Sequence, residues 1–233
     1  MEVQIGVAKI NKYASSESGD TLEVIERPNG GLSVVLADGQ RSGKSAKRIS
    51  NIVVRKVISL LAEGVRDGAA ARAASDYLFT ERGGKVQSTL NILSIDLTSN
   101  TLVITRNNPA PMLIAQNGTI KTLDEESQSV GVRRDTRPVI TEAQIEEGLL
   151  VVAYSDGLVH AGDRVGQHLD VSAELQGLLD EDASPQQIAD GLMDKAMQLD
   201  DGRPIDDISV VVLAVTVRNG DDIRRMSMRL PIR

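Results

Sequence analysis

Aliphatic and β-branched runs separated by turn signals open the chain. Residues 3–10, 22–26 and 32–37 are short apolar runs of the kind that forms strands. The sequence Pro28-Asn29-Gly30-Gly31, between the last two runs, is a strong turn signal. The pattern predicts that the chain begins as an antiparallel meander or hairpin.

Two helical patterns follow. Apolar residues recur every three or four positions from 46 to 60, with Lys and Arg on the other faces. The next pattern begins at Asp67, which we expect to be the helix N-cap, and ends at the Gly83-Gly84 pair.

The second half returns to strands and then adds two more helices. Predicted hairpin turns lie at Asn100 and at Asn117-Gly118. Helices are predicted at 171–179 and from Ser184, which precedes a proline at the first helical position. The predicted strands are 86–97, 101–105, 111–115, 119–123, 149–154 and 208–217. Clustered antiparallel strands with helices in pairs indicate an α+β fold. We expect one domain over residues 1–218, followed by a charged tail, 219–233.

Composition narrows the function classes. The chain has 233 residues, a formal net charge of -7, no Cys and 2% aromatic residues. An acidic chain with few aromatic side chains argues against nucleic-acid binding. Without Cys there are no disulfides and no thiolate nucleophile. Residues 1–10 do not show a basic region followed by a long apolar run, so we expect no signal peptide. There is also no apolar run of about 18 residues, so we expect no membrane span and a cytoplasmic protein.

Four acidic sites lie at the ends of predicted strands. They are Gly19-Asp20, Asp38-Gly39, Asp156-Gly157 and Asp206-Asp207. Carboxylates gathered at one rim of a sheet repel one another unless cations compensate them, and Mg²⁺ and Mn²⁺ prefer oxygen ligands. The alternative is ordinary turn chemistry, because Asp-Gly is a common hairpin turn. No predicted strand directly follows either Asp-Gly pair, which weakens that alternative.

The order and context of these motifs resemble the PPM (PP2C-type) phosphatases, in particular their bacterial SpoIIE/RsbU/RsbX-like branch. The resemblance is carried by Gly19-Asp20, Leu36-Ala37-Asp38-Gly39, Tyr154-Ser155-Asp156-Gly157 and the stretch from Asp206-Asp207 to Val212. Supporting matches are Ser88-Thr89-Leu90 and the turn Asn107-Asn108-Pro109-Ala110-Pro111.

The resemblance implies a four-layer α-β-β-α sandwich, two antiparallel sheets flanked by helix pairs, with two divalent cations, Mn²⁺ or Mg²⁺, at one end. By that resemblance Asp38 bridges both cations, and Asp20 and the Gly39 carbonyl bind one of them. Asp156 and Asp206 bind the other. Asp207 matches a position that is often Asn, so which member of Asp206-Asp207 is the direct ligand stays open.

The implied activity is hydrolysis of phosphoserine or phosphothreonine on a protein, by a metal-bridging water and without a catalytic side chain. The implied partners are regulators of the stressosome or anti-sigma-antagonist kind, such as STAS-type proteins. Many relatives carry a His shortly after Asp38-Gly39, whereas this loop holds Arg41, which either contacts phosphate or is solvated. We interpret His160 and His168 as surface or packing residues without a carboxylate partner.

Two other functions stay open. One is a catalytically weak protein-binding module on the same fold, and the other is a hydrolase of small phosphoesters.

Overall fold

Two five-stranded antiparallel sheets form the centre of the molecule. The structure, a computed structural model, describes residues 1–231. In spatial order, the first sheet contains β1 (Glu2–Ile10), β10 (Ile208–Thr216), β9 (Leu150–Tyr154), β6 (Met112–Gln116) and β7 (Thr119–Leu123). The second contains β2 (Asp20–Glu26), β3 (Leu32–Asp38), β4 (Leu90–Asp96), β5 (Thr101–Asn107) and β8 (Val139–Gln144).

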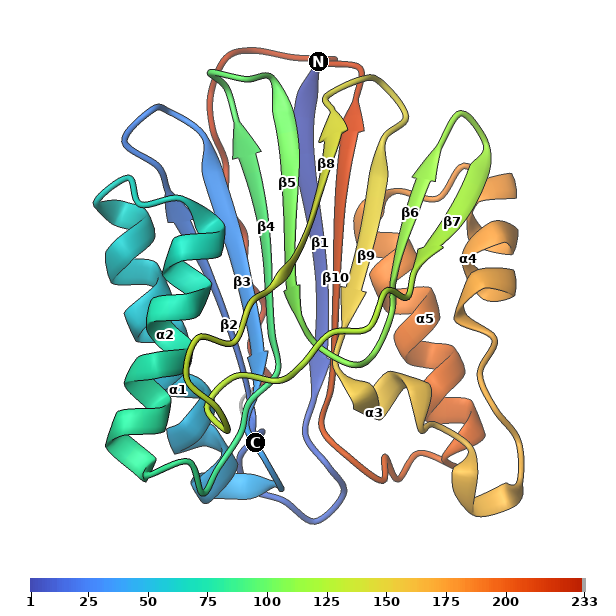
Figure 1. Ribbon diagram of the computed structural model, residues 1–233. Coiled ribbons are helices and arrows are strands. Elements are labelled where there is room, and N and C mark those ends of the chain that lie inside the picture. Colours follow the sequence, from blue (N-terminus) through green and yellow to red (C-terminus); the bar gives the residue numbers. More distant parts are fainter. Residues whose placement is uncertain (232–233) are drawn as a thin grey trace.

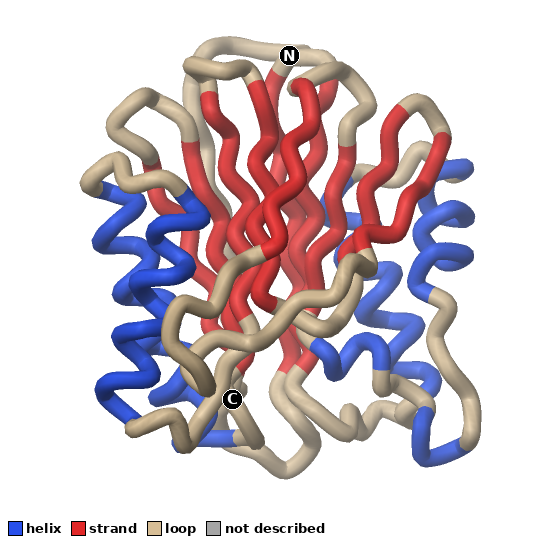
Figure 2. Tube along the Cα trace, in the orientation of Figure 1, coloured by secondary structure: helices blue, strands red, loops and turns tan. Residues whose placement is uncertain are grey.

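A pair of helices covers the outer face of each sheet, as Figures 1 and 2 show. On one flank lie α1 (Gly43–Ala62) and α2 (Asp67–Arg82), and on the other lie α4 (Val171–Asp180) and α5 (Pro185–Leu199). The short helix α3 (Asp156–Val159) and a 3₁₀ turn (Asp163–Val165) follow β9. The four-layer α-β-β-α sandwich predicted from the sequence is confirmed.

Apolar side chains fill all three interfaces between the layers. Leu36 and Val211 belong to the core between the sheets, Val35 packs toward α1 and α2, and Val212 packs toward α4 and α5. Alternate residues of a strand point to opposite faces, so β3 and β10 supply the central core and one helix interface each. Consequently every residue of β10 except its last is buried.

Several predicted boundaries differ from the structure. The expected strand 86–97 begins only at Leu90, and β8 was missed. Asp67 is not an N-cap, because Arg66 takes that position and the Asp67 carboxylate binds Arg27 instead. The turns at Asn100 and Asn117 are confirmed, each with a positive φ.

After β10 the chain forms no helix or strand up to residue 231. The predicted tail also includes residues 232 and 233, which lie outside the described part. Within residues 1–231, each helix is too short or too polar to cross a membrane.

Candidate metal centre

Asp20 and Asp38 stand directly opposite each other, as paired residues of β2 and β3. Leu22 and Leu36, two positions further along their strands, also pair and pack in the core between the sheets. Because side chains two apart on a strand share a face, both carboxylates are directed toward the space between the sheets. They lie at its end, where the apolar core stops.

The backbone around Asp38 is held by the segment that precedes β4. Ser88 Oγ donates a hydrogen bond of 2.6 Å to the Asp38 carbonyl, which also accepts from the Thr89 N–H at 2.9 Å. The Asp38 N–H donates to Thr89 Oγ1 at 3.2 Å. The next residue must be glycine, since a Cβ on Gly39 would lie 2.0 Å from the Ala46 carbonyl oxygen. This glycine lets α1 pack directly against the turn.

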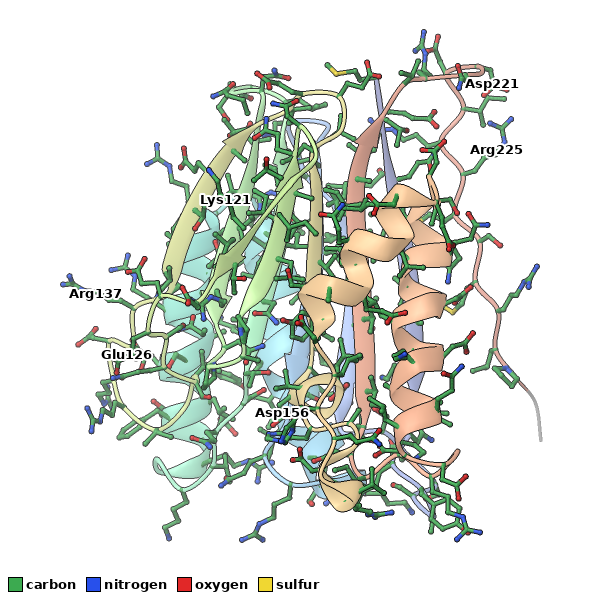
Figure 3. The ribbon with its side chains drawn as sticks, turned by 90° about the vertical axis from the view of Figure 1, so that its right-hand side faces the viewer. Lys121, Glu126, Arg137, Asp156, Asp221 and Arg225 are labelled. Carbon is green, nitrogen blue, oxygen red and sulfur yellow. The ribbon has the colours of Figure 1, made fainter. Side chains whose placement is uncertain are left out.

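The other sheet supplies Asp156 and Asp206. Asp156 is the first residue of α3, directly after β9, and Asp206 comes just before β10, the strand beside β9. Figure 3 shows Asp156 at the lower end of the sandwich. A Cβ on Gly157 would lie 2.2 Å from the Asp207 carbonyl oxygen, so glycine is required for these two segments to approach. The close approach brings Asp156 and Asp206 together.

Electrostatics shows that these carboxylates share one neighbourhood. The pKa of Asp38 is raised to about 10, first by burial and then by the negative charges of Asp20 and Asp156, with Asp206 adding to them. Burial also raises the pKa of Asp20 to about 6. The pKa of Asp206 is raised by burial and by the charge of Asp156. The charges of the other three Asp side chains therefore all act on Asp38, and their proximity to it is unfavourable without a counter-charge.

The carboxylate of Asp20 is only half satisfied. Ser209 Oγ, on β10, donates a hydrogen bond of 2.6 Å to Asp20 Oδ2, whereas Oδ1 is buried and accepts no hydrogen bond from any other residue in the described range 1–231. On the backbone side, the ammonium groups of Lys9 and Lys47 donate to the Asp20 carbonyl at 2.7 and 2.6 Å. A buried carboxylate oxygen without a donor is costly, and a cation removes that cost.

Asp207 has a different environment from its neighbour Asp206. Its Oδ1 accepts from the Lys12 N–H at 2.9 Å and its Oδ2 from the Gly19 N–H at 2.8 Å. These two bonds close the loop between β1 and β2, and Asp207 is 2% exposed. Asp206 is half-buried, and within residues 1–231 its carboxylate accepts one hydrogen bond, from the Asp207 N–H to Oδ1.

A divalent cation fits this set of donors, because hard ions prefer carboxylate oxygens and Asp20 Oδ1 is vacant as an acceptor. As the side chains stand, however, no three Asp, Glu or His groups within residues 1–231 surround a common point closely enough to hold an ion. The structure thus brings Asp20, Asp38, Asp156 and Asp206 into one region without closing them around a centre. Ion binding requires side-chain rotation.

Comparison with known proteins agrees with this arrangement. The family model of Stage II sporulation protein E (SpoIIE) matches residues 28–216. The chain belongs to the SpoIIE family. Stage II sporulation protein E of Bacillus subtilis is 24% identical over 214 residues, which are 91% of this chain and 26% of that protein. The chain therefore spans about a quarter of the length of that curated relative.

Solved structures show the same fold as this SpoIIE-family chain. The PP2C phosphatase domain of SpoIIE from Bacillus subtilis, solved with a fragment of its regulatory domain, superposes with a TM-score of 0.79 at 23% identity. That match covers 92% of this chain and 64% of the other. RsbX in complex with magnesium gives a TM-score of 0.68 at 15% identity, over 92% of this chain and 96% of the other.

Some features of the SpoIIE-family site were not found from the sequence. Ser209, Lys9 and Lys47 contact Asp20 from β10, β1 and α1. Ser209 lies in the stretch that carries the resemblance, but its contact with Asp20 was not expected, and nothing in the local pattern marks the two lysines. The expectation that His160 and His168 lack a carboxylate partner was wrong, since both bind Asp163, at 2.9 and 3.0 Å.

Proposed function

We propose that this domain is a metal-dependent phosphatase that removes phosphate from Ser or Thr of a regulatory protein in the cytoplasm. One observation carries the proposal. Carboxylates from both sheets, Asp20 and Asp38 on one side and Asp156 and Asp206 on the other, meet at the end of the sandwich, where Asp20 Oδ1 is buried and has no hydrogen-bond partner among the residues that the structure describes. The family membership and the magnesium in RsbX support the same chemistry.

Within this proposal, two cations, Mn²⁺ or Mg²⁺, would be held by these carboxylates, and Asp38 would serve both. Asp20 and the Gly39 carbonyl would bind one, and Asp156 and Asp206 would bind the other. Asp207 is a positioning residue, because backbone N–H groups occupy both of its oxygens. These two bonds support Asp206 as the direct ligand of the pair.

When bound, the cations supply positive charge that stabilises phosphoryl oxygens and lowers the pKa of water. The chain's own residues hold the carboxylates ready for them. Ser209 fixes one Asp20 oxygen, and Ser88 and Thr89 fix the backbone of Asp38. The chain has no Cys, so hydrolysis without a covalent intermediate on the protein suits its composition.

The substrate class is the finer part of the proposal. Phosphoserine or phosphothreonine on a STAS-type or similar partner-switching regulator is inferred from the likeness to SpoIIE and RsbX domains.

Hydrolysis of an aryl phosphate and of phosphoserine peptides, with chelator, Mg²⁺ or Mn²⁺, tests the proposal. We expect activity only with metal, and a loss of about 100-fold or more in Asp38→Asn. Asp194→Asn, an exposed carboxylate on α5, is the matched control and keeps full activity. If the folded protein hydrolyses neither substrate with either metal, the catalytic proposal is wrong and the binding-module alternative remains.

A further inference from the structure

The two helical layers carry opposite charge. Residues 43–82, which contain α1 and α2, include eight Lys and Arg against four Asp and Glu. Residues 171–199, which contain α4 and α5, include one Lys and six Asp and Glu. In Figure 1 these layers lie on opposite flanks of the sandwich. A chain with net charge -7 therefore keeps one basic flank, and a flank of a single sign creates a field that steers charged partners.

Three basic residues of α1, Lys44, Arg48 and Arg55, form what we call the basic stripe. Their spacings of four and seven residues place them on one face of the helix. All three are exposed. Within residues 1–231, none of the three forms an ion pair or a side-chain hydrogen bond with another residue. Surfaces that mix positive and negative side chains usually serve solubility, but helix α1 contains no acidic residue.

The stripe begins beside the candidate metal centre. Lys44 is six residues after Asp38, and Gly39 packs against Ala46 in the first turn of α1. Helix α2 runs back toward the same end, where it finishes at exposed Arg82. The first turn of α1 therefore lies next to the turn that carries Asp38.

We propose that the basic stripe docks an acidic segment of the phosphoprotein substrate, next to its phosphorylated residue. This inference rests on the proposed function. From Lys44 to Arg55 the stripe extends about 17 Å along the helix. About five or six residues of extended peptide cover that length. One short acidic segment is thus long enough to span the stripe.

The chemistry of the stripe favours a protein over other anionic partners. Interfacial membrane helices present large apolar side chains beside their basic residues, whereas the other fully exposed positions of α1 are Ser45, Ser59 and Ala62. Single-stranded nucleic acid is bound by aromatic stacking, and α1 has no aromatic residue. An acidic peptide needs only the charges that are present.

Two phosphoserine peptides with the same core test the docking. One carries six Asp and Glu beside the core, and the other carries Ser and Gly there. We expect kcat/KM to be about tenfold higher for the acidic peptide at low ionic strength, and the difference to vanish at about 0.5 M salt. In Arg48→Glu/Arg55→Glu the preference is lost, while hydrolysis of an aryl phosphate is unchanged.

The control is Lys121→Glu/Arg164→Glu, which changes the net charge equally at exposed positions away from α1 and α2. It keeps about the wild-type preference. Equal loss of preference in both double variants, or no preference in the wild type, overturns the docking. Tight binding of the stripe only to vesicles with anionic lipid, or self-association abolished by Arg48→Glu/Arg55→Glu, also overturns it.

Binding of the two peptides, labelled with fluorescein and followed by anisotropy, separates this inference from the proposed function. If no substrate is hydrolysed but the acidic peptide still binds through the stripe, the phosphatase proposal fails and the docking surface stands. If aryl phosphate is hydrolysed and the two peptides bind equally, only the docking surface fails.

Discussion

Ser209 donates a hydrogen bond of 2.6 Å to Asp20, and this bond joins the two sheets at the end of the sandwich where the carboxylates meet. Ser209 is on β10 of the first sheet and Asp20 begins β2 of the second. The bond fixes Oδ2 of Asp20, so that its partnerless oxygen, Oδ1, keeps a defined direction. Residues that orient a metal ligand influence affinity without touching the ion.

Replacing Ser209 therefore changes metal affinity more than it changes the fold. We expect Ser209→Ala to raise the Mn²⁺ concentration needed for half-maximal phosphatase activity by about tenfold. The matched control is Ser33→Ala, which removes another buried hydroxyl pair, the 2.6 Å contact with Ser94. That variant loses about 1 kcal/mol of stability and keeps its Mn²⁺ dependence. Equal Mn²⁺ dependence in both variants would show that Ser209 does not orient Asp20.

Substitutions of the adjacent residues Asp206 and Asp207 are expected to have different effects on activity and stability. Asn has one carboxamide oxygen, so Asp207→Asn loses one of the bonds to the Lys12 and Gly19 N–H groups. We expect urea unfolding to show a loss of about 1–3 kcal/mol, with metal-dependent activity retained. Asp206→Asn loses metal-dependent activity and keeps or gains stability without metal, because a repelled charge is removed. The reverse pattern would assign the ligand to Asp207.

Stability of the metal-free protein should fall as pH rises. The pKa of Asp38 is raised to about 10 in the folded protein, against about 4 in an unfolded chain. The folded state therefore binds the proton more tightly. The contribution of this protonated Asp38 to the free energy of unfolding is complete below about pH 4 and is lost as pH rises through about 10. The raised pKa of Asp20, about 6, acts only in the lower part of this range.

Chemical unfolding in chelator between pH 7 and 9 isolates the effect of Asp38. The free energy of unfolding should decrease by up to about 1.4 kcal/mol per pH unit, and Asp38→Asn should lose that slope. With saturating Mn²⁺ the slope should disappear, because the metal-bound folded state and the unfolded chain both hold a deprotonated Asp38 between pH 7 and 9. A metal-free slope that is the same in the wild type and in Asp38→Asn would mean that Asp38 is not the titrating group.

Much of the fold was predictable because many of its strands and turns are marked by the types of residues that form them. The run 208–217 and the Asn117-Gly118 turn carry their structure in neighbouring residues, and they became β10 and the β6–β7 hairpin. Strand β8 was missed although Val139, Thr141 and Ala143 alternate with more exposed residues. The period-two pattern is weak in the sequence because the exposed position 140 is Ile and the half-buried position 141 is Thr. Helix α3 is a single turn, too short for a helical period to appear.

The candidate site was predictable only in part, for a related reason. Asp-Gly pairs at strand ends are visible in the sequence, and the structure brings Asp38 and Asp156 into one electrostatic neighbourhood. The partners that hold the site come from far along the chain. Ser209 is 189 positions from Asp20, and no local pattern connects them. Long-range pairing also explains why Asp67 was mistaken for a helix cap.

The ion pair between Arg27 and Asp67 fixes α2 against the β2–β3 hairpin. Arg27 Nη1 lies 2.6 Å from Asp67 Oδ1, and Arg27 Nη2 donates to the Val65 carbonyl at 3.0 Å. Their side chains are only 12% and 5% exposed. Removing one partner of such a pair leaves the other charge buried and uncompensated, which costs about 3–5 kcal/mol.

We therefore expect Asp67→Ala to lower the free energy of unfolding by about 3 kcal/mol, whereas loss of a simple cap costs about 1 kcal/mol. The double variant Arg27→Met/Asp67→Leu should recover most of that loss, because it removes both charges and keeps apolar volume. Urea unfolding of the wild type, Arg27→Met, Asp67→Leu and the double variant gives the coupling energy directly. If the double variant loses the sum of the two single losses, the two side chains act independently and Asp67 stabilises α2 only locally.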